Sequence, residues 1–217
     1  MMSRSPSLPA LDYGQLFSDP AMFDSREKFA AAGFTVKRRS RDDKIMIGSH
    51  PSVPGHMFKK FTRKVRCHDQ RENYRERISG ANAIRAVIAK HGLDHLVVAN
   101  KWLYELPRAF GERRRCRDLL VVERLDLIKA SESKRLYRTI DHVALAQLCR
   151  VLHTFSGFDA AVHNLKFTTA GQIAFFDTES WNQRARPFAR VFRYLAEELP
   201  RKSLSFAEQL FERFDDE

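Results

Sequence analysis

Two carboxylates and an amide in the second half of the sequence have the types and spacing of metal ligands. Asp159 precedes Asn164 by five positions, and Asp177 directly follows an apolar run. Between Asn164 and Asp177, two apolar stretches flank Thr168–Gly171, which predicts a two-stranded hairpin whose glycine supplies the positive φ of the turn. Such a hairpin brings Asn164 and Asp177 to the same end. Amide and carboxylate oxygens are ligands that Mg²⁺ prefers, so we expect a magnesium site there.

These three residues, in this order around a hairpin, resemble the catalytic loop and metal-binding segment of the protein-kinase-like fold. That family includes protein kinases and the aminoglycoside and small-molecule phosphotransferases. Its first Asp orients the acceptor hydroxyl, and its Asn and second Asp bind the metal on the nucleotide phosphates. The resemblance therefore implies that Asp159 is catalytic, that Asn164 and Asp177 bind the metal, and that ATP and Mg²⁺ are the cofactors.

The resemblance also implies an α+β, two-lobed protein-kinase-like fold. We expect a flexible arm at residues 1–20, an N-lobe at 21–124 and a C-lobe at 125–217. The N-lobe would be a small antiparallel sheet with one long, regulatory-type helix, and the C-lobe would be reduced and mostly helical. Apolar alternation predicts strands at 34–37, 44–47, 56–61, 96–99, 101–106 and 119–123. Helical periodicity predicts helices at 24–32, 69–90, 140–154, 188–199 and 204–214.

The third expected strand supplies a candidate for binding the nucleotide phosphates. In the family this strand carries a Val-Ala-Ile-Lys pattern whose Lys holds the α- and β-phosphates. Aligned with residues 56–59, His-Met-Phe-Lys, the pattern assigns that catalytic role to Lys59. Met57, two positions earlier on the same face, would lie over the adenine. Lys60 is the alternative, because a shift of one residue in register brings it to that face.

The resemblance implies further nucleotide contacts from the long helix and from the last strand of the sheet. Glu76 is better placed than Glu72 to pair with Lys59, and an exposed helical glutamate without this role is the alternative. Adenine would be bound by backbone groups around the end of the strand, which makes Glu123 and Leu125 cofactor-binding residues.

Some positions depart from the family pattern. Residues 38–43, between the first two expected strands, contain no glycine, so a Gly-rich phosphate loop is missing. Ala161 stands where the family often has a Lys, and Asp177-Thr178-Glu179 replaces the Asp-Phe-Gly triplet. Two hypotheses follow: a minimal ATP-dependent kinase acting on a protein, or a pseudokinase whose basic surface binds an acidic partner. Transfer of a nucleotidyl group is a third hypothesis, and a small molecule or a lipid headgroup is an alternative acceptor to a protein.

The charge of the chain is strongly basic. The formal net charge is +11, and much of it is clustered at residues 37–41 and 113–117. Such clusters favour an anionic partner, whether nucleotide phosphate, acidic protein, nucleic acid or a phosphoinositide surface. A solvated loop that only aids solubility is the alternative for each cluster. We do not expect nucleic acid to be the main partner, because no ribonucleoprotein motif or basic heptad accompanies the clusters.

The cysteines, the apolar runs and the N-terminus indicate where in the cell the protein is expected. Three widely spaced cysteines predict reduced thiols and a cytoplasmic location rather than a disulfide framework or a zinc site. No apolar run has the length of a membrane span, and the N-terminus has no apolar core of a classical secretory signal. Export as an effector by a route without such a signal is the alternative.

Overall fold

The computed structural model describes residues 13–36, 45–61, 66–107, 116–155, 157–158, 160–179 and 187–215. The chain divides into two compact units. Unit 1 comprises Met1–Ile78 and Asn100–Arg124, and unit 2 comprises Ser79–Ala99 and Leu125–Glu217. Each unit has its own hydrophobic core. The long helix α3 (Cys67–His91) is divided between the two units after Ile78. Within the described ranges no helix is long and apolar enough to cross a membrane.

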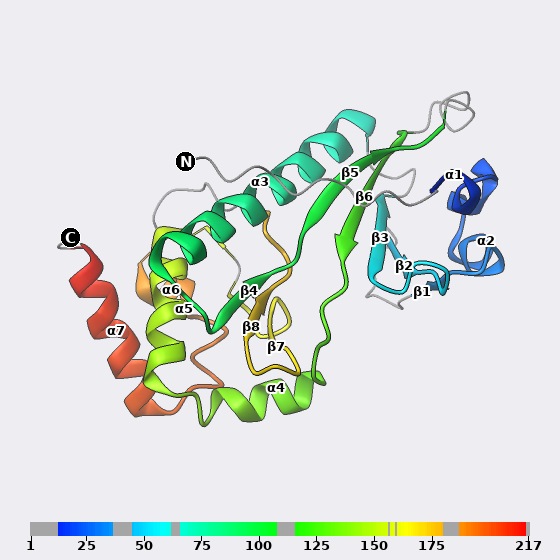
Figure 1. Cartoon of the computed structure of the whole chain (residues 1–217). Coiled ribbons are helices and arrows are strands. Elements are labelled where there is room, and N and C mark those ends of the chain that lie inside the picture. Colours follow the sequence, from blue (N-terminus) through cyan, green and yellow to red (C-terminus); the bar gives the residue numbers. More distant parts are fainter. Residues whose placement is uncertain are drawn as a thin grey trace. The chain divides into compact units, whose positions relative to one another are not determined.

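Unit 1 is built on a five-stranded antiparallel sheet with the strand order β1-β2-β3-β6-β5 (Figure 1). Its strands are β1 (Thr35–Val36), β2 (Ile45–Ser49), β3 (His56–Phe61), β5 (Lys101–Glu105) and β6 (Asp118–Glu123). Five of the strands predicted from apolar alternation are thus confirmed to within a few residues, and the sixth, predicted at 96–99, forms a strand (Leu96–Val98) of the other sheet. The α+β class, with an antiparallel sheet and one long helix, is confirmed as well.

Three short helices precede the sheet: α1 (Tyr13–Leu16), the 3₁₀ helix η1 (Pro20–Phe23) and α2 (Arg26–Ala31). Ser25 caps α2 by accepting a hydrogen bond from the Lys28 amide, as its residue type predicts. The rings of Tyr13 and Phe17 are almost completely buried and pack edge-on against Phe58 of β3. The expectation that residues 13–20 belong to a flexible arm is therefore wrong, while residues 1–12 lie outside the described part.

The N-terminal half of α3 packs on the sheet of unit 1. Tyr74 is fully buried, stacks on Phe61 at 5.2 Å between ring centroids and accepts a hydrogen bond from the Phe61 amide at 2.8 Å. The helix ends at His91, and Gly92 follows with a φ of 60°, which a glycine adopts at low cost. The predicted helix 69–90 is confirmed.

Unit 2 contains a three-stranded sheet with the order β4-β8-β7. Strand β8 (Ile173–Phe175) pairs in parallel with β4 (Leu96–Val98) and antiparallel with β7 (Leu165–Phe167). The helices of the unit are α4 (Ala130–Tyr137), α5 (His142–Thr154), α6 (Phe188–Val191) and α7 (Arg201–Asp215). Helices α5 and α7 were predicted and are confirmed, whereas α4 was not predicted.

The predicted helix at 188–199 is too long. Only its first turn forms α6, and residues 193–198 continue as turns. Leu195 and Leu199 are nevertheless buried in the unit 2 core. The helical spacing of the apolar residues thus predicted their burial correctly, but it did not predict the backbone conformation of this segment.

Candidate functional site

The β7–β8 hairpin holds Asn164 and Asp177 at the same end. The Phe176 amide donates a hydrogen bond to the Asn164 carbonyl at 3.1 Å, so the cross-strand pairing of Leu165 with Phe175 extends by one step beyond the ladder. Asp177 is the next residue after Phe176. At the other end, Gly171 has a φ of 82°, which is the conformation its residue type predicted. The predicted hairpin is confirmed.

The oxygens that this hairpin end provides suit a hard cation. Asn164 is buried, with 4% exposed, and Asp177 is half-buried. No group of three His, Cys, Asp or Glu residues with the geometry of a metal site occurs among the described residues. Mg²⁺ does not require one, because waters and substrate phosphates usually complete its shell around one or two carboxylates. The chemistry of an amide and a carboxylate therefore fits this ion.

The loop before the hairpin contains the predicted catalytic residue, Asp159, which lies outside the described residues. Its neighbours Phe158 and Ala160 are both buried, and the Phe158 ring packs edge-on against Phe175 of β8 at 5.3 Å between centroids. Ala161 is also buried. The residues around Asp159 are thus anchored in the unit 2 core, and no amine stands at position 161.

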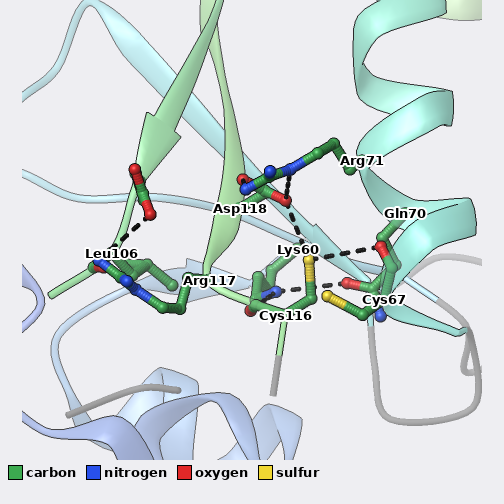
Figure 2. A network of polar contacts seen from close by, with 9 residues as sticks. Lys60, Cys67, Gln70, Arg71, Leu106, Cys116, Arg117 and Asp118 are labelled. Carbon is green, nitrogen blue, oxygen red and sulfur yellow. Dashed lines mark hydrogen bonds and ion pairs between the residues drawn. The ribbon is translucent and has the colours of Figure 1, made fainter. Parts of the chain in front are cut away.

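Lys59 and Lys60 of β3 have different environments. Lys60 is buried, and its Nζ donates hydrogen bonds to the Cys116 carbonyl at 2.6 Å and to Gln70 Oε1 at 3.3 Å. Lys59 is half-buried and, by strand alternation, lies on the opposite face with Met57. Of the two candidates, Lys60 is therefore a component of an internal polar network in unit 1 (Figure 2).

Strand register adds a residue that sequence reasoning missed. Met57 pairs with Val122, and Val122 pairs with Lys101 of β5, so these three side chains lie in one row on the Lys59 face of the sheet. Lys101 is 4% exposed. The sequence could not place this second amine on the Lys59 face, because the pairing of β6 with both β3 and β5 sets it.

The ion pair between α3 and β6 has the opposite charge arrangement from the one that the resemblance implies for α3 and the sheet. Arg71 of α3 forms two hydrogen bonds with the Asp118 carboxylate of β6, so the helix supplies the cation and the strand supplies the anion (Figure 2). Asp118 is 1% exposed. Glu76, half-buried on α3, keeps its assignment as partner of Lys59 as a prediction.

The Asp118 carboxylate is also the acceptor of a thiol. Cys116 Sγ donates to Asp118 Oδ2 at 3.2 Å. Burial raises the pKa of Asp118, but hydrogen bonds from Arg71 and Cys116, with the charges of Arg71 and Lys60, outweigh it and hold that pKa below the ordinary value. Burial raises the pKa of Cys116 to about 12. At neutral pH the pair is therefore a carboxylate and a protonated thiol.

Two backbone amides at the end of β6 already donate hydrogen bonds within the protein. The Glu123 amide donates to the Asn100 carbonyl at 2.8 Å, and the Arg124 amide donates to the Gly55 carbonyl at 2.8 Å. The Glu123 carboxylate in turn accepts from the Asn100 amide. An adenine contact in this segment would therefore use the Glu123 carbonyl or the backbone of Leu125, not the Glu123 amide.

A cavity of about 850 Å³ lies elsewhere in unit 1, between the N-terminal helices and the β2–β3 turn. Among its polar lining residues, His50 Nδ1 lies 2.6 Å from Ser52 Oγ, and Lys28 pairs with Asp24. It contains none of the residues that the kinase-like resemblance assigns.

The basic clusters fall mostly outside the described residues, since 37–44 and 108–115 are not described. Arg117 is the exception. Its Nε donates to the Leu106 carbonyl at 2.9 Å, and its Nη2 lies 3.3 Å from Glu105 Oε1. This arginine therefore has contacts within its own sheet.

Comparison with known proteins finds no family model that matches the chain and no matching curated protein. The kinase-like interpretation accordingly depends on the residues and the geometry described above.

Proposed function

We propose that the chain is an ATP- and Mg²⁺-dependent phosphotransferase, a minimal atypical kinase whose acceptor is a protein. The observation that carries the proposal is the hydrogen bond from the Phe176 amide to the Asn164 carbonyl. It holds the backbone of Asn164 beside that of Phe176, so Asn164 and Asp177 lie at one end of the hairpin, in the order that the kinase-like fold uses. Phosphoryl transfer requires mainly positioning and charge neutralisation, so a small set of residues is sufficient.

Each residue has a defined role in this proposal. Asn164 and Asp177 hold Mg²⁺, which neutralises phosphate charge when bound. Lys59 binds the α- and β-phosphates, and Met57 lies over the adenine. Asp159 orients the acceptor hydroxyl and accepts its proton. The internal hydrogen bonds of Lys60 support the choice of Lys59 for the phosphates.

The proposal is tested by measuring ATP binding and transfer of labelled γ-phosphate with and without Mg²⁺. The variants are Asp159→Ala and Asp177→Ala, with Glu208→Ala, at an exposed position of α7, as the matched control. We expect Asp177→Ala to lose Mg²⁺-dependent ATP binding by about tenfold or more and to lose transfer. Asp159→Ala should retain binding and lose transfer by about a hundredfold or more. A wild-type protein that binds no ATP with Mg²⁺ would refute the proposal.

A pseudokinase that binds an acidic partner is the second candidate. The buried Ala161 favours it, because no amine at that position can neutralise the moving phosphoryl group. In this case the same assay would find no phosphate transfer in the wild type, and Asp159→Ala would have no effect in it. Binding to an acidic peptide would instead weaken steeply as salt rises. The labelled product of an active enzyme would distinguish a protein acceptor from a small molecule or a lipid headgroup.

A further inference from the structure

Two of the three cysteines lie next to each other in unit 1, although they are 49 positions apart. Cys67 is the first residue of α3, and Cys116 lies two residues before β6. Cys116 Sγ is 3.7 Å from the Cys67 carbonyl oxygen (Figure 2). Both are free thiols, with Cys67 exposed and Cys116 buried.

This geometry is compatible with a disulfide bond. Ordinary backbone bond lengths place Cys116 Sγ within about 6 Å of the Cys67 Cα. Disulfide-bonded residues usually have Cα atoms about 4.4–6.8 Å apart, so closing the bond requires the first turn of α3 and the segment before β6 to approach each other. The third cysteine, Cys149, is fully buried within α5 of unit 2 and provides an internal control.

We propose that Cys67 and Cys116 are a redox pair that closes to an intramolecular disulfide by exchange with a small-molecule disulfide. The bond would fix the N-terminus of α3 to the segment that enters β6. This inference does not depend on the phosphotransferase proposal, because it uses only contacts within unit 1.

The exposure of the two thiols sets the order of the exchange. Cys67, the exposed thiol, attacks one sulfur of the external disulfide, forms a mixed disulfide, and passes its proton to the departing sulfur, which leaves as one thiol. Cys116 Sγ then attacks the Cys67 sulfur, and its proton passes to the second departing thiolate. Two protein thiols are oxidised to one disulfide, and the external disulfide is reduced to two thiols.

The change also alters the network around Asp118. The reduced Cys116 thiol donates to Asp118 Oδ2, and the disulfide removes that donor. Asp118 keeps both hydrogen bonds from Arg71, so the contact between α3 and β6 persists and gains a covalent link.

The test is to incubate the folded full-length protein with oxidised glutathione and to analyse it by intact-mass and non-reducing peptide mass spectrometry. Wild type and Cys149→Ser should both lose the mass of two hydrogen atoms and yield a peptide that links Cys67 to Cys116. Cys116→Ser should gain the mass of one glutathione on Cys67. Cys67→Ser should show neither change, because the exposed thiol that begins the exchange is gone. Cys67→Ser alters only an exposed side chain, so it tests the proposal even if Cys116→Ser does not fold.

Two results would overturn the inference. One is a wild-type protein that keeps glutathione on Cys67 without forming the cross-link, and the other is a cross-link that involves Cys149. Hydrogen exchange reports on the helix: the amides of residues 67–74 should exchange more slowly after oxidation and return to the original rate with a reducing thiol. Unchanged exchange in the cross-linked protein would refute the fixing of α3.

Discussion

The guanidinium of Arg71 donates two hydrogen bonds to the carboxylate of Asp118, at 2.7 and 2.8 Å (Figure 2). The pair joins the first turns of α3 to the start of β6 within unit 1. The two partners differ in exposure, since the Asp118 side chain is 1% exposed and that of Arg71 is 45% exposed. Removing either partner therefore leaves a different group behind.

We predict that Arg71→Met destabilises the protein more than Asp118→Asn does. The first variant leaves a buried carboxylate without its guanidinium, which costs about 3 kcal/mol. The second leaves a guanidinium that water can reach, which costs about 1–2 kcal/mol. Urea unfolding of the two variants and of the double variant measures both costs and their coupling. Arg75→Met, at an exposed position of the same helix, is the control, with a change within about 0.5 kcal/mol. Equal losses in the two single variants would contradict the asymmetry.

The same pair predicts an acid-dependent stability. Because the folded-state pKa of Asp118 lies below its ordinary value, its stabilising contribution is fully present above the unfolded-state pKa of about 3.9 and is lost as pH falls through the folded-state pKa. Between about pH 4 and pH 2 the free energy of unfolding should therefore fall more steeply in wild type than in Asp118→Asn. Urea midpoints across this range test the difference, and parallel curves would show that another carboxylate is responsible.

We predict that substituting Lys60 mainly lowers stability, whereas substituting Lys59 mainly weakens ATP binding. Lys60→Met removes two internal hydrogen bonds and should lower the free energy of unfolding by about 1–3 kcal/mol. Lys59→Met should cost less stability but weaken ATP binding by about tenfold if the proposed function is correct. Chemical unfolding and nucleotide titration on both variants separate the two effects. Weaker ATP binding in a folded Lys60→Met, with normal binding in Lys59→Met, would reverse the assignment.

Tyr74→Phe tests the contact between α3 and β3. The Phe61 amide donates to the Tyr74 hydroxyl at 2.8 Å, and the change leaves this part-buried amide without its acceptor. We expect a loss of about 1 kcal/mol in the free energy of unfolding. The control is Tyr194→Phe, at a residue that is 50% exposed, which should change stability by less than about 0.5 kcal/mol. Equal changes at the two positions would mean that the hydroxyl contributes little.

Local signals were sufficient to predict much of the fold. The β7–β8 hairpin followed from two apolar stretches and Gly171, because the turn needs a positive φ and the strands need only alternation. Ser25 precedes the start of α2 and Gly92 follows the end of α3, and both are residue types that commonly flank helix ends, since helix caps involve residues close in sequence.

Other elements depend on contacts that are distant in sequence. Helix α4 has few apolar residues. Two hydrogen bonds attach it to β7: Tyr137 donates to the Leu165 carbonyl, and Ser133 accepts from the Phe167 amide. Tyr13 and Phe17 follow a Ser- and Pro-rich stretch, and their burial depends on Phe58 of β3. Tertiary packing stabilises short helices that are marginal by themselves.

The sequence by itself determined the order of candidate residues, from Lys59 through Asn164 to Asp177, and the hairpin that brings the last two together. It did not decide between Lys59 and Lys60, because strand periodicity is unchanged when the register shifts by one residue. The pairing of β3 with β2 and β6 places Lys60 in the network with Gln70 and Cys116. The proximity of Cys67 to Cys116 was likewise decided only by the tertiary structure, because no local pattern records a contact across 49 positions.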